Sequence, residues 1–548
     1  MTTDRGVAGT TAVIDVAIVG GGVSGAYTAW RLMSSKAAES PVLAELAQGS
    51  STGRLNVRLF ESSDRIGGRL WSVQMDNVPN LPAEVGGMRF LNTQLNVVGV
   101  CAPQQLNLPT ANFGFADNIQ YLRGQHFNDG DYATKPPLPV PGGIPYFLTS
   151  TETNKNPIQL VIAAIEQILP DAMKYKGTDL IEYLRGAVVD GVPLYEWGFW
   201  TLLRSKLSVD AYHLVQDASG YFSIYGNWSA YGAFLEFIRN YADNHYMKVV
   251  GGYQQIPLAM IERFRELGGH AQINSHLLDV QPDSVGGEPV IRLEFMLSDG
   301  TTRFTRYAHH AVLAMPQRSF QLLDPASLPL QSAAFREDIM TVTPEPASKL
   351  FLTFDEPWWT PLGITTGRSD TDLPLRQCYY IGTETAAPHT GMSLLMASYN
   401  DGMADSYWDT YLDRSAYGPN QAPYAGKHSD GTDPRLFAPH DMVIDVHGQL
   451  EEMHGIQIPL PTAAVYHNWQ EDPIGAGWYF WNPHVRSWEV APRVRRPIAD
   501  LNLYTCGSCY SENQGWVEGA LNTAEMMLHD CLGLPRATWL PDDYYIGP

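Results

Sequence analysis

The 548-residue sequence contains only five cysteines, and they are scattered along the chain. So small and odd a number excludes a disulfide framework and favours a reducing compartment. No segment reaches 18 apolar residues without a charge, and the polar start MTTDRGVAGTTAVID lacks the apolar core of a signal peptide. We therefore expect no membrane span, and we expect a cytoplasmic protein more than one secreted without a recognisable signal.

Basic residues are also scarce, since 36 Lys and Arg stand against 58 Asp and Glu, for a net charge of −22 at pH 7. A chain of this charge repels polyanions, which argues against a nucleic-acid partner. Hydrophobic residues make up 44% of the chain and charged residues 17%, a balance that excludes extensive disorder. The length suggests two or three domains.

The first clear pattern is a short β-branched run, Val13–Val19, that ends in three glycines. It predicts a strand buried on both faces of a parallel sheet. A helix is predicted over Val23–Met33 and, after a polar insertion rich in serine and alanine, a second strand over Asn56–Phe60. Together these segments predict a βαβ unit with a long crossover.

A Gly-x-Gly-x-x-Gly pattern, formed by Gly20, Gly22 and Gly25, joins this strand to this helix. One glycine makes the tight turn, the second lets a pyrophosphate approach the backbone, and the third lets the helix pack on the strand. Glu61, at the end of the second strand, is placed to bind the ribose of an adenosine. The pattern alone leaves NAD and FAD as equal candidates.

Along the rest of the chain, the spacing of the hydrophobic residues is first typical of helices and then typical of strands. Helical spacing predicts a mostly helical segment from about 150 to 245, with helices at 158–169, 178–185 and 230–241. Alternating patterns then predict strands at 289–297, 303–314, 349–354 and 393–399. We expect loops or a domain crossing at 101–145, which is rich in Pro, Gly and Asn, and loops at 407–448, which is polar.

The residues after Glu61 favour FAD. The stretch ESSDRIGGRLWS (61–72) resembles the second FAD signature of the flavin amine oxidase superfamily. Four more stretches resemble its L-amino-acid oxidases, in family order and across nearly the whole chain: AEVGGMRF (83–90), VGGY (250–253), KLFLT (349–353) and CGSCYSENQGWVEGAL (506–521). The sequence is therefore similar to the FAD-dependent L-amino-acid oxidases.

This resemblance implies a mixed α/β fold with a Rossmann-type FAD-binding domain, a β-sheet substrate domain and a helical insertion. We place the FAD-binding domain at 11–85, 246–330 and 484–548, the substrate-binding domain at 86–149 and 331–483, and the helical domain at 150–245. No metal site is predicted. The residues implied to contact FAD are Gly20, Gly22, Val23, Ser24, Gly25, Glu61, Ser62, Gly68, Arg69, Gly86, Gly87, Met88, Arg89, Leu277, Gly507, Ser508, Gly515, Trp516, Val517 and Ala520. Ser508 stands where many relatives have an acid, but its hydroxyl can still bond a ribitol hydroxyl.

The resemblance also implies that Arg89 binds the carboxylate of an amino-acid substrate, because relatives that act on monoamines or polyamines lack an arginine there. A guanidinium matches a carboxylate in two parallel hydrogen bonds. Tyr399 is the candidate for a second carboxylate contact, with Tyr379 and Tyr380 as alternatives. Lys349 would hold a water that assists the reaction of reduced flavin with oxygen.

Near the C-terminus, the resemblance implies that the Gly515 carbonyl accepts a hydrogen bond from the substrate amine and that Trp516 forms a wall of the site. Trp478 and Trp481 would line the side-chain pocket. We expect a broad preference for large apolar or aromatic amino acids. The same rings could also hold a lysine ammonium by cation–π contact, assisted by an acid that the sequence does not locate.

The implied reaction is the oxidative deamination of L-amino acids, with hydride transfer to FAD, reoxidation by O2 to hydrogen peroxide, and release of a 2-oxo acid and ammonia. A flavin amino-acid 2-monooxygenase and a monoamine or polyamine oxidase stay open as alternatives. Relatives are commonly dimers, so we expect a homodimer. Cys506 and Cys509 are spaced as a redox pair, but we interpret this spacing as coincidence, because the expected strand and turn would bury Cys506.

Overall fold

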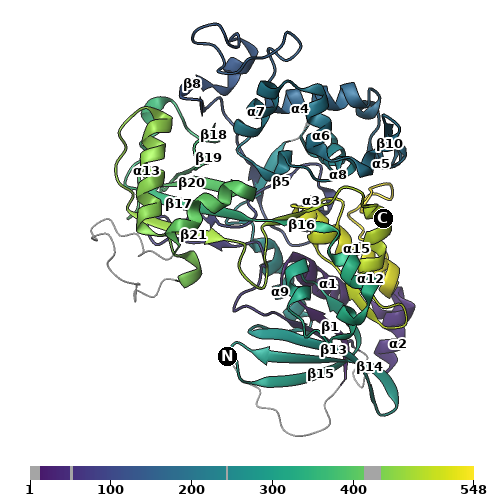
Figure 1. The fold of residues 1–548 in the computed structure, drawn as a ribbon. Coiled ribbons are helices and arrows are strands. Elements are labelled where there is room, and N and C mark those ends of the chain that lie inside the picture. The colour runs from purple at the N-terminus through teal and green to yellow at the C-terminus, as the bar shows by residue number, and fades with distance from the viewer. Residues whose placement is uncertain (1–12, 50–53, 242–244, 413–432) are drawn as a thin grey trace.

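The computed structural model describes residues 13–49, 54–241, 245–412 and 433–548, and in these residues the chain forms two seven-stranded sheets, A and B (Figure 1). Sheet A has the order β12-β2-β1-β15-β14-β13, with β23 also paired to β15. Sheet B has the order β21-β17-β20-β19-β18-β7-β8. Helices pack around both sheets, which confirms the mixed α/β class.

Sheet A is built on β1, which lies parallel to both β2 and β15. Val16 and Ile18 of β1 pack in one core with α1 (Val23–Ser34), α9 (Gln255–Glu266) and α15 (Val517–Leu532). Ala17 and Val19 point to the other face and pack in a second core. The predicted βαβ unit is therefore confirmed. The strands are β1 (Ile14–Val19), β2 (Val57–Phe60), β12 (His270–Gln272), β13 (Ser275–Val285), β14 (Glu288–Leu297), β15 (Arg303–Leu313) and β23 (Leu503–Thr505).

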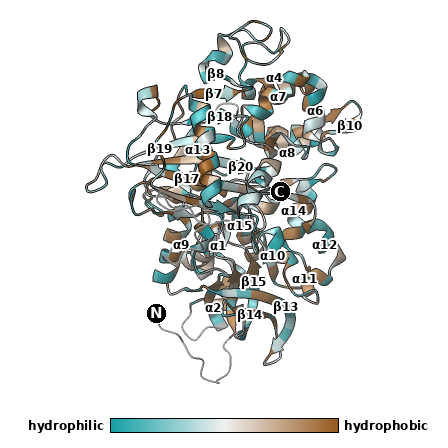
Figure 2. Cartoon of the chain, turned by 60° about the vertical axis from the view of Figure 1, so that its left-hand side comes forward, coloured by the Kyte–Doolittle hydropathy of each residue, from teal (hydrophilic) through white to brown (hydrophobic). Residues whose placement is uncertain are grey.

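Sheet B is centred on β17 and β20, and all eight residues of β17 are buried. Leu350 and Leu352 pack against α13 (His440–His454) on one face, whereas Phe351 packs with Met88 on the other. Figure 2 shows the hydrophobic residues of these strands in brown beneath α13. The strands are β7 (Ile119–Leu122), β8 (Gln125–Asn128), β17 (Ala347–Phe354), β18 (Arg368–Thr371), β19 (Gln377–Thr383), β20 (Ser393–Asp401) and β21 (Ala463–Asn468).

The segment predicted to be mostly helical, from about 150 to 245, is confirmed in its described residues, and residues 242–244 of that prediction lie outside them. It contains α4 (Pro157–Ile168), α5 (Gly177–Gly186), α6 (Phe199–Lys206), α7 (Val209–Asp217) and α8 (Ala230–Glu236), and α8 continues into a π-helical turn, Phe237–Tyr241. Asn156 caps α4, because its side chain accepts a hydrogen bond from the Gln159 backbone amide, while the Gln159 side-chain oxygen accepts one from the Asn156 backbone amide. These helices share one hydrophobic core.

The remaining elements are short. They are α2 (Pro41–Gly49), α3 (Leu95–Cys101), α10 (Gln317–Gln321), α11 (Leu328–Gln331), α12 (Ala333–Ile339) and α14 (Ser487–Arg495), together with the strands β3 (Ser72–Val73), β4 (Ala83–Glu84), β5 (Phe90–Leu91), β6 (Thr110–Asn112), β9 (Val188–Val189), β10 (Val192–Pro193), β11 (Tyr246–Val249), β16 (Val342–Glu345) and β22 (Trp478–Trp481). The pairing of β16 with β22 connects the strand region before β17 to the aromatic run near residue 480.

Two regions predicted to be loops contain regular structure. The region 101–145 holds β6, β7 and β8, which are only three or four residues long, too short to show a clear alternating pattern. The region 407–448 holds the start of α13, whose apolar residues are spaced for one buried face but are separated by many polar ones. Residues 413–432 of that prediction lie outside the described part of the chain.

The strands of sheet A all lie within the ranges predicted for FAD binding, and those of sheet B within the ranges predicted for substrate binding. The division into separate domains stays a prediction. Across the described ranges, no helix combines the length and the apolar character that a bilayer span requires.

A buried polar network joins the first helix of the fold to the last. The Glu525 carboxylate of α15 accepts hydrogen bonds from Arg31 Nη1 and Tyr27 Oη of α1, each at 2.6 Å. The Glu525 side chain is 1% exposed and that of Arg31 is 9% exposed. This ion pair therefore holds α1 and α15 against each other in the interior.

We expect Glu525→Gln to lower the free energy of unfolding by about 3 kcal/mol, because it leaves the buried Arg31 guanidinium without its counter-charge. Urea unfolding followed by tryptophan fluorescence measures the change. The control Glu266→Gln removes an exposed ion pair with Arg263 and should cost less than about 1 kcal/mol. Equal losses in the two variants would contradict a structural role for the buried pair.

Candidate functional site

A cavity of about 440 Å³ is lined by residues of sheet A, sheet B and the helical segment. Nearly all of the predicted site residues reach it, although they come from distant parts of the chain. Those that line it are Gly20, Gly22, Val23, Ser24, Glu61, Ser62, Gly68, Arg69, Gly86, Gly87, Met88, Arg89, Leu277, Lys349, Tyr399, Trp478, Gly507, Ser508, Gly515, Trp516, Val517 and Ala520.

Gly25 and Trp481 do not line the cavity, and neither do the alternative tyrosines Tyr379 and Tyr380. Gly25 packs α1 on the preceding turn, since a Cβ there would lie 1.9 Å from the Gly20 carbonyl oxygen. Trp481 faces away from the cavity, and its indole N–H donates to the Ser511 carbonyl at 2.8 Å. The reason is the two-residue period of β22, which puts Trp478 and Phe480 on the cavity side and Trp481 on the opposite face.

One end of the cavity is formed by the turn between β1 and α1. Gly22 lies against Gly68, so that a Cβ on Gly68 would approach the Gly22 Cα to 3.1 Å. Gly68 has a φ of +56°, a left-handed conformation that favours glycine. The Glu61 carboxylate accepts hydrogen bonds from the backbone amides of Gly21 and Ser63. The backbone at Gly22, the backbone at Gly68 and the Glu61 carboxylate thus all face this end of the cavity.

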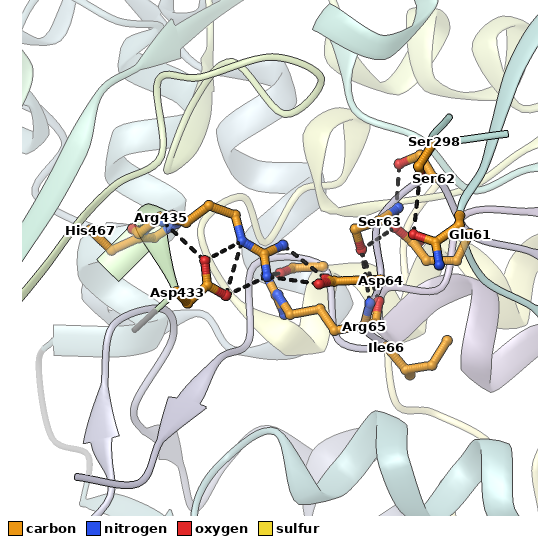
Figure 3. A network of polar contacts seen from close by, with 12 residues as sticks. Glu61, Ser62, Ser63, Asp64, Arg65, Ile66, Ser298, Asp433, Arg435 and His467 are labelled. Atoms are coloured by element: carbon orange, nitrogen blue, oxygen red, sulfur yellow. Dashed lines mark hydrogen bonds and ion pairs between the residues drawn. The ribbon is translucent and has the colours of Figure 1, made fainter. Parts of the chain in front are cut away.

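An arginine outside the recognised motifs, Arg435, also lines the cavity, and Figure 3 shows it between Asp433 and Asp64. The Arg435 guanidinium forms two hydrogen bonds with the Asp64 carboxylate, at 2.9 and 3.1 Å, and is also paired with Asp433. The Arg435 carbonyl lies 2.9 Å from His467 Nδ1 of β21. Arg435 therefore connects the loop after β2 in sheet A with sheet B across the cavity that it lines.

Arg89 lies in the middle of the site and is 8% exposed. Its Nη1 donates to the Tyr379 hydroxyl at 3.4 Å and its Nη2 to the Tyr221 hydroxyl at 3.2 Å. The guanidinium carbon is 4.2 Å from the ring centre of Tyr246. Among the described residues, no carboxylate lies within ion-pair distance of Arg89. A buried cation without a counter-charge is costly, which marks this position as one that a ligand anion would satisfy.

The three candidate tyrosines lie in different places. Tyr379 contacts Arg89 and donates to the Gln377 side chain at 3.0 Å. Tyr399 lines the cavity but contacts Lys349, whose Nζ lies 4.5 Å from its ring centre. Tyr380 points to the other face of β19, where its hydroxyl is 2.6 Å from His454 Nε2. The alternative Tyr379 is thus the tyrosine that the structure brings to the guanidinium.

Lys349 is buried in β17 opposite Tyr399 of β20. Its Nζ donates to the Glu84 carbonyl at 3.0 Å and to the Gly86 carbonyl. Burial lowers the pKa of Lys349, the Glu84 carboxylate opposes this shift, and the nearby Arg89 adds to it. The side chain therefore reaches the cavity with an ammonium that loses its proton more readily than an ordinary lysine.

The C-terminal motif supplies another wall of the cavity. Gly515, with a φ of +79°, precedes Trp516 and the start of α15. Arg69 donates to the Ser508 hydroxyl at 2.8 Å and to the Gly477 carbonyl at 2.9 Å. Because Arg69 directly follows the glycine pair at 67–68, its bond to Ser508 connects the C-terminal motif to that pair. This part of the cavity brings the start of α15 close to the turn of sheet A.

Cys506 and Cys509 are both buried free thiols, which confirms the expected burial of Cys506. Burial raises the pKa of each thiol to about 12. Neither is therefore a reactive thiolate at neutral pH.

Sequence reasoning missed two polar residues of the helical segment. Tyr221 binds Arg89, and Glu236 lines the cavity beside Trp516. Neither lies in a recognisable motif, and only the packing of the helical segment against the sheets brings them to the site. Burial raises the pKa of Glu236 to about 7.

Three comparisons place this chain among known proteins. It is 26% identical to aplysianin-A of Aplysia kurodai over 545 residues, covering 94% of this chain and 90% of that one. It is 25% identical to an L-amino-acid oxidase of Mus musculus over 514 residues, covering 90% and 68%. A putrescine oxidase structure with bound putrescine has a TM-score of 0.64 at 15% identity, with 95% and 100% covered, and this likeness supports the fold.

The family model described as flavin containing amine oxidoreductase matches residues 24–417, which is more than half of the sequence. The matched region includes Glu61, Arg89 and Lys349. The chain is therefore a FAD-dependent member of the flavin-containing amine oxidoreductase family.

Proposed function

We propose that the protein oxidises L-α-amino acids, so that one amino acid, one O2 and one water give a 2-oxo acid, ammonia and hydrogen peroxide. The observation that carries this proposal is Arg89, a buried guanidinium in the cavity with no carboxylate partner among the described residues. Similarity to proteins named L-amino-acid oxidase supports the same substrate class. The aromatic walls at Trp478 and Phe480 suit large side chains.

The residues around the first turn would hold FAD. Gly22 and Gly68 leave backbone exposed to the cavity, and the N-terminus of α1 offers amide groups to a pyrophosphate. Glu61 is held by two backbone amides where a ribose would bind. Bound FAD supplies the hydride acceptor that no side chain can provide.

Arg89 would bind and orient the substrate. Hydrogen bonds to Tyr379 and Tyr221 fix the guanidinium, so little freedom is lost when a carboxylate binds. The rings of Phe113 and Tyr246 lie against it and exclude water, which strengthens the pairing. The Gly515 carbonyl would accept a hydrogen bond from the substrate amine. Two fixed contacts then determine where the α-hydrogen points.

Lys349 would hold a water and move a proton in the oxygen half-reaction. An ammonium has three N–H donors, and two of them donate to the carbonyls of Glu84 and Gly86. The third is left for a water in the cavity. Because burial lowers the pKa of Lys349, the group can release its proton as oxygen is reduced.

A diamine oxidase is the second candidate, favoured by Glu236, a carboxylate in the cavity that could bind a distal ammonium, and by the structural likeness to putrescine oxidase. An amine without a carboxylate would leave Arg89 buried and unpaired, so we favour amino acids. An amino-acid 2-monooxygenase would also use Arg89. It differs in forming no hydrogen peroxide from the oxygen that it consumes.

Replacing Arg89 tests the substrate class. We expect Arg89→Met to lower kcat/KM for L-amino acids about a thousandfold, because the buried charged pair with the carboxylate is lost. Rapid mixing without oxygen, followed by the flavin absorbance, measures the reductive step. Arg303→Met, which replaces an exposed arginine of β15, is the control and should behave as wild type. If amino acids reduce the flavin of Arg89→Met as fast as that of the wild type, Arg89 does not bind the substrate carboxylate as proposed.

Replacing Lys349 separates the two half-reactions. We expect Lys349→Met to slow reoxidation of the reduced flavin by O2 about a hundredfold, because the water and its proton donor are lost. Flavin reduction by substrate should change far less. Stopped-flow mixing of the reduced protein with oxygenated buffer gives the rate, with the exposed Lys248→Met as control. A slower reductive step with unchanged reoxidation would contradict this role.

A further inference from the structure

The cavity that Arg89 lines also contains a buried carboxylate, Glu236. Glu236 is the last residue of α8, where the helix passes into the π-helical turn, and it is 8% exposed. Trp516 Nε1 donates to its Oε1 at 2.7 Å, and Asn240 Nδ2 donates to its Oε2 at 2.7 Å. The carboxylate is thus held in position, because each of its two oxygens accepts a hydrogen bond from a different side chain.

The hydrogen bonds do not use up this carboxylate. Each oxygen accepts one bond and has capacity for a second, which the cavity side leaves open to a ligand. Within the described ranges no cationic side chain lies at ion-pair distance from Glu236, and Arg239 acts on it only from further away. A buried carboxylate in this state is stabilised by any cation that enters the cavity.

The position of Glu236 relative to Arg89 fits one class of ligand. The Arg89 guanidinium lies 4.2 Å from the ring centre of Tyr246, and the Tyr246 and Trp516 rings stack with their centres 6.4 Å apart. The Trp516 indole N–H in turn donates a hydrogen bond to Glu236. Two aromatic rings therefore separate the cation from the anion. An extended lysine side chain spans about 6 Å from Cα to Nζ by standard bond lengths. Its methylene stem would pack along aromatic surface while its two ends reach opposite charges.

We propose that Glu236 is a specificity-determining residue that binds the terminal cation of the substrate side chain, so that the protein prefers basic L-amino acids. This inference rests on the proposed function, because Arg89 must hold the α-carboxylate for the side chain to point toward Glu236. It replaces the expected preference for large apolar or aromatic side chains, which would leave the buried carboxylate unpaired.

The test compares L-lysine with L-norleucine, which has nearly the same shape but no side-chain charge. The ratio of their kcat/KM values should favour lysine in the wild type and fall about thirtyfold in Glu236→Gln, which keeps the shape and removes the charge. Glu262→Gln, an exposed carboxylate of α9, is the matched control and should keep the wild-type ratio. An unchanged ratio in Glu236→Gln would overturn the inference.

A second measurement needs no variant. In the wild type, 6-aminohexanoate should inhibit norleucine oxidation at least about tenfold more strongly than hexanoate, because only the former offers both a carboxylate and a cation. Equal inhibition would overturn the role of Glu236. If norleucine is oxidised and lysine is not preferred, the role of Glu236 is wrong but the proposed function stands. If no amino acid reduces the flavin, the proposed function itself is wrong.

Discussion

The account depends on one buried charge. Arg89 lies in the interior among aromatic rings, hydrogen-bonded to two tyrosines, and faces a cavity in which no carboxylate of the described residues pairs with it. Removing a guanidinium from water is costly unless an anion repays the lost hydration. Aromatic walls and neutral hydroxyls orient the group but do not neutralise it. In the function proposed above, a ligand carboxylate would complete this arrangement and would fix which carbon of the ligand faces the flavin.

The fold assembles the site from parts that are incomplete alone. Sheet A contributes the glycine turn and Glu61, and sheet B contributes Lys349 and Tyr399 through the pairing of β17 with β20. The helical segment then adds Tyr221 and Glu236. Three regions of the chain therefore meet at one cavity. Arg435 connects the two sheets across it.

Sequence patterns located the parts of the site that lie in local motifs. The βαβ turn and Glu61 follow from a spacing that carries steric meaning, whereas Arg89 and Lys349 follow from the resemblance to L-amino-acid oxidases. All of them line the cavity. Trp481 was misplaced because the aromatic run was treated as one wall, although a strand points alternate residues to opposite faces. Tyr221 and Glu236 could not be predicted, since their helical segment has no signature for this site. Only tertiary packing brings them to it.

The most direct measurement compares L-norleucine with pentylamine, which is the same molecule without its carboxylate. Each is mixed with the purified protein in the absence of oxygen while the flavin absorbance is followed. If a buried guanidinium positions the substrate through its acid end, norleucine bleaches the flavin and pentylamine does so far more slowly, by about a thousandfold. Equal rates for the two compounds would contradict the account, because the carboxylate would then have no partner that matters for the reaction.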